Sequence, residues 1–323
     1  MGGPMACEMK FGVWLPVYGG WLIGAPIEEP EISYTYVEKC ARKAEELTFD
    51  SVWIADHLLN PRKGEQVAAL EAWSTLTAVA THTKRVKLGH AVLCQGFRYP
   101  AVLAKMAATL DEISNGRFIF ALGAGWFKRE FEAYGIPWGD HDELIERAGE
   151  QIKIVNALWT QESVNFSGRY YRLVNANLVP KPVQKPRPLI WYGGNSEKSR
   201  QLVADNSDID GWFISSGSLE EVREKISDMK SRTQGRKLEY AMYAFTLLSR
   251  TEQEGEDMVK RLAAGDPSTI IWALKPGLVG PPAKIIEQLH KFQQAGINHV
   301  TLLFSSTLDN LGEFSWQVID RMH

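Results

Sequence analysis

The chain has 323 residues, of which 45% are hydrophobic and 23% are charged, and its formal net charge is −3. These values are typical of a globular protein with a full core, and no basic block indicates nucleic acid or membrane as a partner. The three cysteines, Cys7, Cys40 and Cys94, form no CxxC motif and no cluster with metal-ligand spacing. We therefore expect no disulfide framework, no metal and a location in the cytoplasm.

Short apolar segments alternate with longer amphipathic segments, which is typical of repeated β–α units around a parallel sheet. Strands are predicted at residues 10–16, 51–55, 86–93, 118–123, 189–193, 209–214, 239–248 and 299–304. Helices with a 3.6-residue period are predicted between them, for example over residues 35–48 and 141–159. Eight such units predict a TIM barrel, (β/α)8, formed by residues 10–323 as a single domain. Residues 1–9 are predicted to be a disordered or vector-derived leader.

An open doubly wound sheet is the main alternative fold. Its glycine-rich dinucleotide turn after the first strand is missing, because GVWLPVYGGW has glycines at a different spacing. A barrel has its active site at the C-terminal ends of the strands. Two long insertions are predicted on this face. Residues 163–188 contain a predicted strand pair, and residues 265–280 have the length and position of a lid.

The segments that follow the predicted strands are aromatic, rich in glycine and poor in charge, as at residues 17–21, 56–59, 94–97, 123–127 and 193–196. This composition favours a flat conjugated cofactor over a sugar or a metal. The turn at residues 193–196 leads into a predicted helix, whose N-terminus is a natural phosphate site. The same turn is equally well explained as an ordinary helix cap at Asn195 or Ser196.

His57 follows Asp56 and is the one histidine predicted at the C-terminal end of a strand. It can act there as a general acid or base or hydrogen-bond to a reduced ring, although a structural role is the alternative. Glu130 is either a cofactor ligand or a solvated helix charge, and Cys94 is better explained as a core residue than as a reactive thiol. Surface or capping positions are expected for the other histidines, His82, His90, His141, His290, His299 and His323.

Extended segments resemble the bacterial luciferase-like flavin-dependent oxidoreductases, in particular the alkanesulfonate and dimethylsulfone monooxygenase group. They include KFGVWLPVYGGWL, PAVLAKMAATLDEISNGRF, GAGWFKREFEAYGIPWGDHDE and GGNSEKSRQL, and they cover nearly the whole chain. The resemblance implies a homodimeric or homotetrameric TIM barrel that receives reduced FMN (FMNH2) from a separate flavin reductase. It implies that the enzyme uses O2 to oxidise a small organic sulfur or nitrogen compound.

The resemblance also implies roles for individual residues. His57 and Asp56 correspond to catalytic residues beside the flavin ring. The residues expected to bind the cofactor are Gly125, Trp126, Glu130, Gly193, Gly194, Asn195 and Ser196, of which the last four would form the phosphate turn.

Two departures from the family pattern bear on the substrate and the cofactor. Tyr243 and Phe245 stand where sulfonate monooxygenases commonly have arginine and histidine, which argues against an alkanesulfonate substrate. Leu144 and Ile145 replace an Arg-Tyr pair near the phosphate. The motif ADHLL also resembles the deazaflavin (F420) branch, so an F420-dependent hydride-transfer enzyme is the first alternative. A flavin-binding protein without turnover is the second.

Overall fold

A computed structural model describes residues 8–18, 32–61 and 64–322 of the chain. Its strands are β1 (Lys10–Trp14), β2 (Ser51–Ile54), β3 (Lys87–His90), β4 (Leu93–Cys94), β5 (Phe118–Gly123), β6 (Val164–Ser167), β7 (Arg172–Ala176), β8 (Ile190–Gly193), β9 (Gly211–Ile214), β10 (Glu239–Leu248), β11 (Val279–Gly280) and β12 (His299–Phe304). Its α-helices are α1 (Tyr34–Glu46), α2 (Ala72–His82), α3 (Pro100–Ile113), α4 (Lys128–Ala133), α5 (His141–Thr160), α6 (Glu197–Asp205), α7 (Leu219–Arg232), α8 (Glu252–Leu262), α9 (Pro267–Leu274), α10 (Pro282–Ala295), α11 (Thr307–Phe314) and α12 (Asp320–Met322). Shorter helical turns lie at Gln95–Phe97 and Ser315–Ile319.

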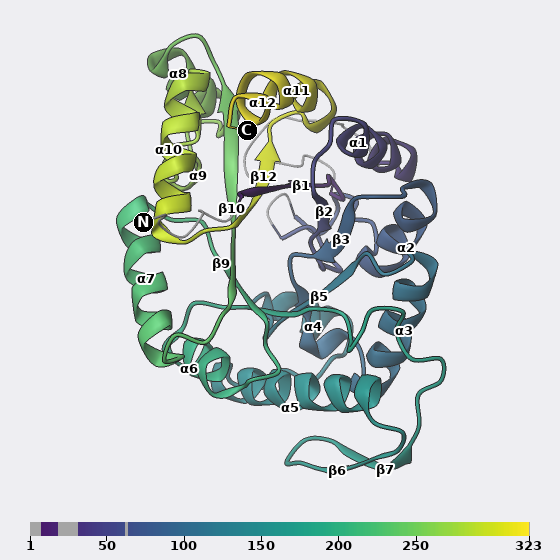
Figure 1. The fold of residues 1–323 in the computed structure, drawn as a ribbon. Coiled ribbons are helices and arrows are strands. Elements are labelled where there is room, and N and C mark those ends of the chain that lie inside the picture. The colour runs from purple at the N-terminus through teal and green to yellow at the C-terminus, as the bar shows by residue number, and fades with distance from the viewer. Residues whose placement is uncertain (1–7, 19–31, 62–63, 323) are drawn as a thin grey trace, which may run out of the picture.

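Eight parallel strands form a closed barrel, which confirms the predicted TIM-barrel fold. Their order is β1, β2, β3, β5, β8, β9, β10 and β12, and β12 pairs again with β1. Helices surround the barrel on the outside (Figure 1). Because the sheet closes on itself, the open doubly wound alternative is excluded.

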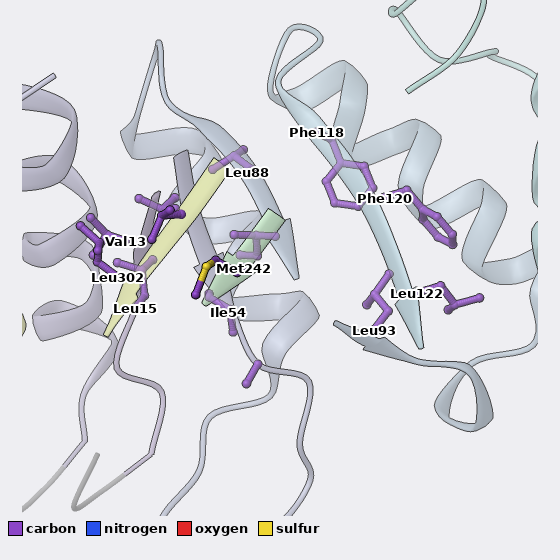
Figure 2. Packing of buried hydrophobic residues seen from close by; sticks show 14 of the residues in the cluster. Val13, Leu15, Ile54, Leu88, Leu93, Phe118, Phe120, Leu122, Met242 and Leu302 are labelled. Atoms are coloured by element: carbon purple, nitrogen blue, oxygen red, sulfur yellow. The ribbon is translucent and has the colours of Figure 1, made fainter. Parts of the chain in front are cut away.

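Alternate residues of each strand point to the two faces of the barrel wall. On β5, Phe118, Phe120 and Leu122 lie in the large cluster between the strands and the helices (Figure 2). Ile119 and Ala121 lie in a separate cluster inside the barrel. The continuous apolar run of β5 is therefore explained by burial on both faces.

Two stacked indole rings fill the barrel interior. Trp53 and Trp191 have ring centroids 5.3 Å apart and planes at 21°. A Cβ atom at Gly89 would lie 2.3 Å from the Trp53 ring, so this strand position has room only for glycine. The edges of both rings contact His299, which hydrogen-bonds to Ser51 Oγ at 2.8 Å. These side chains fill the barrel interior, and a cavity opens beyond them at the C-terminal ends of the strands.

Two histidines differ from the sequence-based expectation. His90 and His299 were expected at surface or capping positions, and this prediction is wrong, because both are buried in the wall or interior of the barrel. His90 stacks on Trp73 with ring centroids 5.2 Å apart. A position at the end or the start of a strand therefore does not imply exposure in a barrel whose strands are covered on both faces.

The two insertions lie in different places. The predicted strand pair within residues 163–188 is confirmed as the antiparallel hairpin β6–β7, which stands outside the ring of helices (Figure 1). Glu150 of α5 holds it by accepting hydrogen bonds from three backbone N–H groups of the hairpin turn. The second insertion, residues 265–280, contains α9 and β11. Among the described residues, no helix combines the length and the apolar character needed to cross a membrane.

Candidate functional site

A cavity of about 420 Å³ opens at the C-terminal ends of the barrel strands. Its wall contains all nine residues that the sequence analysis proposed for the site, namely Asp56, His57, Gly125, Trp126, Glu130, Gly193, Gly194, Asn195 and Ser196. The volume falls within the range of small-molecule sites, about 300–1,000 Å³. The structure thus places these residues together, and the role of each remains a prediction. Gly19, Gly20 and Trp21, from the turn after the first strand, lie outside the described residues.

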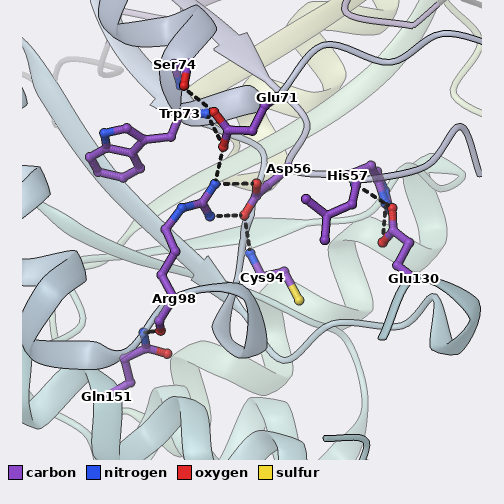
Figure 3. A network of polar contacts seen from close by, with 10 residues as sticks. Asp56, His57, Glu71, Trp73, Ser74, Cys94, Arg98, Glu130 and Gln151 are labelled. Carbon is purple, nitrogen blue, oxygen red and sulfur yellow. Dashed lines mark hydrogen bonds and ion pairs between the residues drawn. The ribbon is translucent and has the colours of Figure 1, made fainter. Parts of the chain in front are cut away.

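His57 is held by a carboxylate on one side of its ring. Its Nδ1 atom lies 3.0 Å from both Oε1 and Oε2 of Glu130. Glu130 Oε1 also accepts hydrogen bonds from the backbone N–H groups of Leu58 and Leu59. A carboxylate can only accept from the ring, so Nδ1 carries the proton and the other ring nitrogen, Nε2, is left for a ligand. Glu130 was expected either at the cofactor or in solvent, and the structure buries it beside His57, where it also lines the cavity (Figure 3).

Asp56 lines the cavity, but its oxygens are bound by protein groups. Arg98 donates from Nη1 to Asp56 Oδ2 at 2.7 Å and from Nη2 to Oδ1 at 3.1 Å. Asp56 Oδ2 also accepts from the backbone N–H of Cys94 at 2.9 Å. The guanidinium of Arg98 reaches Glu71 Oε1 as well, at 2.6 Å. These contacts suit Asp56 to holding the loop rather than to proton transfer (Figure 3).

Gly125 and Trp126 form the part of the wall that follows β5. Gly125 has φ +92°, and a Cβ atom there would lie 2.8 Å from Cys94 Sγ, so the position requires glycine. Trp126 is 58% exposed, and its ring lies edge-on to His57 with centroids 5.6 Å apart. Burial raises the pKa of the Cys94 thiol, which keeps it protonated and agrees with the expected core role.

The turn at residues 193–196 joins β8 to α6. Ser196 is the N-cap of α6 and accepts a hydrogen bond from the Ser199 N–H at 3.2 Å. The capping explanation is therefore correct, and the turn lines the cavity at the same time. Asn195 donates from Nδ2 to Ser215 Oγ, while its Oδ1 atom is buried without a hydrogen-bond partner in the described structure. The turn thus brings a helix N-terminus to the cavity and contains an amide oxygen without a hydrogen-bond partner in the described structure.

The other side of the cavity is formed by four aromatic residues and one leucine, which we call the aromatic arc. It consists of Trp14, Phe213, Tyr243, Trp272 and Leu303. The Trp14 and Tyr243 rings meet edge to face at 5.3 Å, and the Tyr243 and Phe213 rings lie 6.3 Å apart with planes at 30°. Strands β9, β10, β12 and β1 supply four of the five residues and are neighbours in the barrel. Trp272 comes from α9, in the segment predicted to be a lid.

Sequence reasoning did not assign most of this arc to the site. Trp14 and Leu303 lie within predicted strands. The period-2 pattern that turns them inward is masked there by burial on both faces of the strands. Trp272 could have been found as the large aromatic residue of the lid segment. His141, expected at a surface or capping position, is exposed and lines the cavity at the start of α5. Residues 163–188 contribute nothing to the wall.

The departures from the sulfonate monooxygenase pattern take different positions in the structure. Tyr243 lies on the cavity wall, whereas Phe245 is fully buried and packs against Trp272 at 6.2 Å. Leu144 and Ile145 pack behind the cavity in a small apolar cluster with Phe131. Within the described part of the chain, no group of three or more His, Cys, Asp or Glu side chains is arranged to hold a metal ion.

Comparison with known proteins places this site in a family. The model of the luciferase-like monooxygenase family matches residues 9–273. The chain is 31% identical over 274 residues to the FMNH2-dependent dimethylsulfone monooxygenase of Pseudomonas putida. The aligned region covers 82% of this chain and 73% of that protein. It is 33% identical over 287 residues to the F420-dependent glucose-6-phosphate dehydrogenase of Amycolatopsis mediterranei (strain U-32), which covers 80% and 85%.

Solved structures agree in fold. An F420-dependent secondary alcohol dehydrogenase in complex with an F420-acetone adduct superposes with a TM-score of 0.78 over 98% of this chain and 99% of that chain, at 21% sequence identity. At this identity the likeness concerns the fold alone. The family match and the curated relatives support the resemblance seen in the sequence. The chain therefore belongs to the luciferase-like monooxygenase family, as an oxidoreductase of the luciferase-like superfamily.

Proposed function

We propose that the protein is a two-component monooxygenase that uses FMNH2 and O2 to oxidise a small, uncharged organic sulfur or nitrogen compound. The observation that carries the proposal is the division of one cavity into two unlike walls. One wall has the His57–Glu130 pair, glycines and the capped turn at residues 193–196, and the other is the aromatic arc. A bound ring and a small substrate can face each other in this space. The similarity to dimethylsulfone monooxygenases supports this choice.

The residues present fit a flavin mononucleotide. The phosphate would lie at the N-terminus of α6, where Gly194, Asn195 and Ser196 line the cavity. The unsatisfied Oδ1 atom of Asn195 is suited to accept a hydrogen bond from the polar part of the cofactor. When bound, FMNH2 supplies the electrons that reduce O2. His57 would hydrogen-bond through Nε2 at the reacting atoms, and Asp56 would hold the loop on which His57 lies.

The substrate is expected to be uncharged because of the side chains around it. The aromatic arc offers ring faces and edges, which bind methyl groups and weak dipoles through dispersion and the ring quadrupole. Asp56 on the facing wall is paired with Arg98, whereas the described wall residues include no lysine or arginine. An anionic substrate such as an alkanesulfonate would therefore find no cationic side chain to pair with.

A second candidate function is supported by the His57–Glu130 pair. An F420-dependent dehydrogenase removes a hydride from an alcohol and needs a base for the hydroxyl proton, and a histidine held by a carboxylate is a suitable base. The similarity to F420-dependent glucose-6-phosphate dehydrogenases favours the same alternative. A protein that binds flavin without turnover is the third candidate. A flavin reductase partner, a homodimer or homotetramer and a cytoplasmic location complete the proposal.

Anaerobic titration of the purified protein with FMNH2 and with reduced F420, followed by absorbance and fluorescence, tests the cofactor. We expect tighter binding of FMNH2, and tighter binding of F420 would overturn the monooxygenase in favour of the dehydrogenase. The substrate class is then tested with two compounds of similar size. Dimethyl sulfone is expected to raise O2-dependent product formation in the presence of a flavin reductase, and methanesulfonate is not. Equal use of the two compounds would contradict the uncharged substrate.

A further inference from the structure

Arg98 does not touch the cavity, and yet it is connected to the residue before His57. Its guanidinium is largely buried and forms a two-pronged ion pair with Asp56, whose carboxylate is 1% exposed. None of the described cavity-wall residues is Arg98. Of the residues that Arg98 contacts through hydrogen bonds, Asp56 is the one that lines the cavity, so Asp56 connects Arg98 to the site.

The contacts of Arg98 join three segments that are distant in sequence. Asp56 follows β2, Arg98 follows β4 and the turn at Gln95–Phe97, and Glu71 caps the N-terminus of α2. Asp56 Oδ2 also accepts the Cys94 N–H, which ties the end of β2 to β4. The planar fork of a guanidinium can reach both Asp56 oxygens and Glu71 at once, which the single ammonium of a lysine cannot do. Arg98 is thus the common partner of these segments.

The loop that carries His57 is held at both of its ends. At one end, Asp56 is fixed by Arg98 and by the Cys94 N–H. At the other end, Glu130 of α4 accepts from the backbone of Leu58 and Leu59 and from the His57 ring. Figure 3 shows the two carboxylates on either side of His57. The direction of the imidazole depends on both attachments, since the side chain lies between them.

Further contacts fix Arg98 itself. Its guanidinium lies over the Trp73 ring at 5.6 Å, and its backbone carbonyl accepts from Gln151 Nε2 at 3.2 Å. Burial opposes the charged form of Arg98, but Asp56 and Glu71 outweigh burial and raise the pKa of the guanidinium. The charge therefore persists at any physiological pH.

We propose that Arg98 is a positioning residue, which orients the His57 imidazole toward the cavity by holding Asp56. This role is separate from neutralising the buried charge of Asp56. The inference does not depend on whether the cofactor is FMN or F420, because it concerns the protein without ligand.

The two roles are separated by a set of four variants, Arg98→Met, Arg98→Lys, Asp56→Asn and the double variant Arg98→Met/Asp56→Asn. Arg98→Met leaves a buried carboxylate without a cation, and we expect its Tm to fall by roughly 5–15 °C. The double variant has no buried charge at this place, so most of the lost Tm should return. Arg98→Lys keeps the charge and loses the fork.

The position of the His57 imidazole is measured by nitrogen-15 NMR of protein labelled at histidine. The His57 signals are assigned by their absence in His57→Gln. In the wild type we expect one tautomer, with the proton on Nδ1 facing Glu130. In the double variant and in Arg98→Lys we expect averaged shifts from a mixture of tautomers, despite the restored Tm or the retained charge. Wild-type His57 shifts in the double variant would overturn the proposal and leave Arg98 as a charge partner only.

Arg187→Met is the matched control. Arg187 forms a similar two-pronged ion pair with Asp210 before β9, and Arg187 does not line the cavity. We expect a lower Tm with unchanged His57 shifts. Altered His57 shifts in this variant would show that general destabilisation moves the ring, and the proposal would fail. If the wild-type protein does not bind FMNH2, the proposed function is contradicted, and the test of Arg98 remains valid.

Discussion

Glu130 Oε1 accepts hydrogen bonds from the His57 ring and from the backbone of Leu58 and Leu59, so one carboxylate holds both a ring and the loop that carries it. The two residues are 73 positions apart in sequence and meet because β2 and β5 end at the same mouth of the barrel. The arrangement leaves Nε2 of His57 as the group that can exchange a proton with a ligand.

Replacing His57 by Asn should lower turnover of the reductase-supplied holoenzyme by about 100-fold or more, since proton transfer or a hydrogen bond at the reacting atoms is lost. Glu130→Gln should lower turnover less, by about tenfold, because the His57 ring keeps its place and loses only a charged partner. His82→Asn is the control, because His82 lies partly exposed at the end of α2. Unchanged activity in His57→Asn, with FMN still bound, would favour a flavin-binding protein without turnover.

The aromatic arc is expected to protect the reaction from water at the point where α9 covers it. Trp272→Ala removes the indole from the wall. We expect FMN affinity to change less than threefold, while O2 consumption without product formation increases several-fold, because water enters the opened site. Trp316→Ala is the matched control, since Trp316 is 57% exposed and lies away from the cavity wall. Equal coupling of O2 consumption to product in wild type and Trp272→Ala would contradict this role.

The barrel and much of the site could be predicted because both depend on local patterns. Apolar segments of strand length, separated by amphipathic helices, indicate β–α units, and the eight predicted strands match β1, β2, β3, β5, β8, β9, β10 and β12. In such a barrel the residues after each strand converge. This rule placed His57, Gly125 and Ser196 at the mouth of the barrel, and the resemblance to the family pointed to the same residues.

The partners of those residues could not be predicted in the same way. Arg98 lies 42 residues from Asp56, and no spacing in the sequence connects the two. The pairing of Glu130 with His57 likewise depends on where α4 lies after the barrel closes. For His90 and His299 the element was predicted correctly, but the environment was not, because a strand covered on both faces buries polar and apolar residues alike.

Gly125 is predicted to be needed for two separable reasons, its positive φ and its contact with Cys94. Gly125→Ala should destabilise the protein by about 2–3 kcal/mol and weaken FMN binding, because the new methyl group displaces the Cys94 and Phe131 side chains. Gly135→Ala isolates the backbone contribution, since Gly135 has φ +65° and open space around it. This control should cost about 1 kcal/mol and leave FMN binding unchanged.

Chemical denaturation and FMN titration of the two alanine variants test the difference. Adding Cys94→Ala to Gly125→Ala should restore part of the lost stability, because the closest contact of the new Cβ is with Cys94 Sγ. If Gly125→Ala and Gly135→Ala lower the free energy of unfolding equally and both bind FMN normally, the close packing at Gly125 has no role in the cofactor site.

The stability of the fold should fall below neutral pH because of two buried histidines. Burial lowers the pKa of His90 to about 4 and that of His299 to about 3, from an ordinary value of 6.5. Both rings are therefore neutral in the folded protein at pH 5, while the same rings in the unfolded chain have taken up protons. Where the unfolded chain binds more protons than the folded protein, lowering the pH favours the unfolded chain. The free energy of unfolding should therefore decrease as pH falls from about 6.5 to 4.

His90→Phe tests the contribution of one ring. Both ring nitrogens of His90 are buried and neither meets the geometry of a well-formed hydrogen bond, and phenylalanine keeps a flat ring against Trp73. At pH 7 the variant should be at least as stable as the wild type. Between pH 7 and pH 4 its advantage in the free energy of unfolding should grow by up to roughly 3 kcal/mol, at 1.36 kcal/mol per pKa unit. Urea denaturation at pH 7, 6, 5 and 4 measures the slope, with His82→Asn as the exposed control. Identical slopes for wild type and His90→Phe would show that His90 takes up its proton without unfolding the protein.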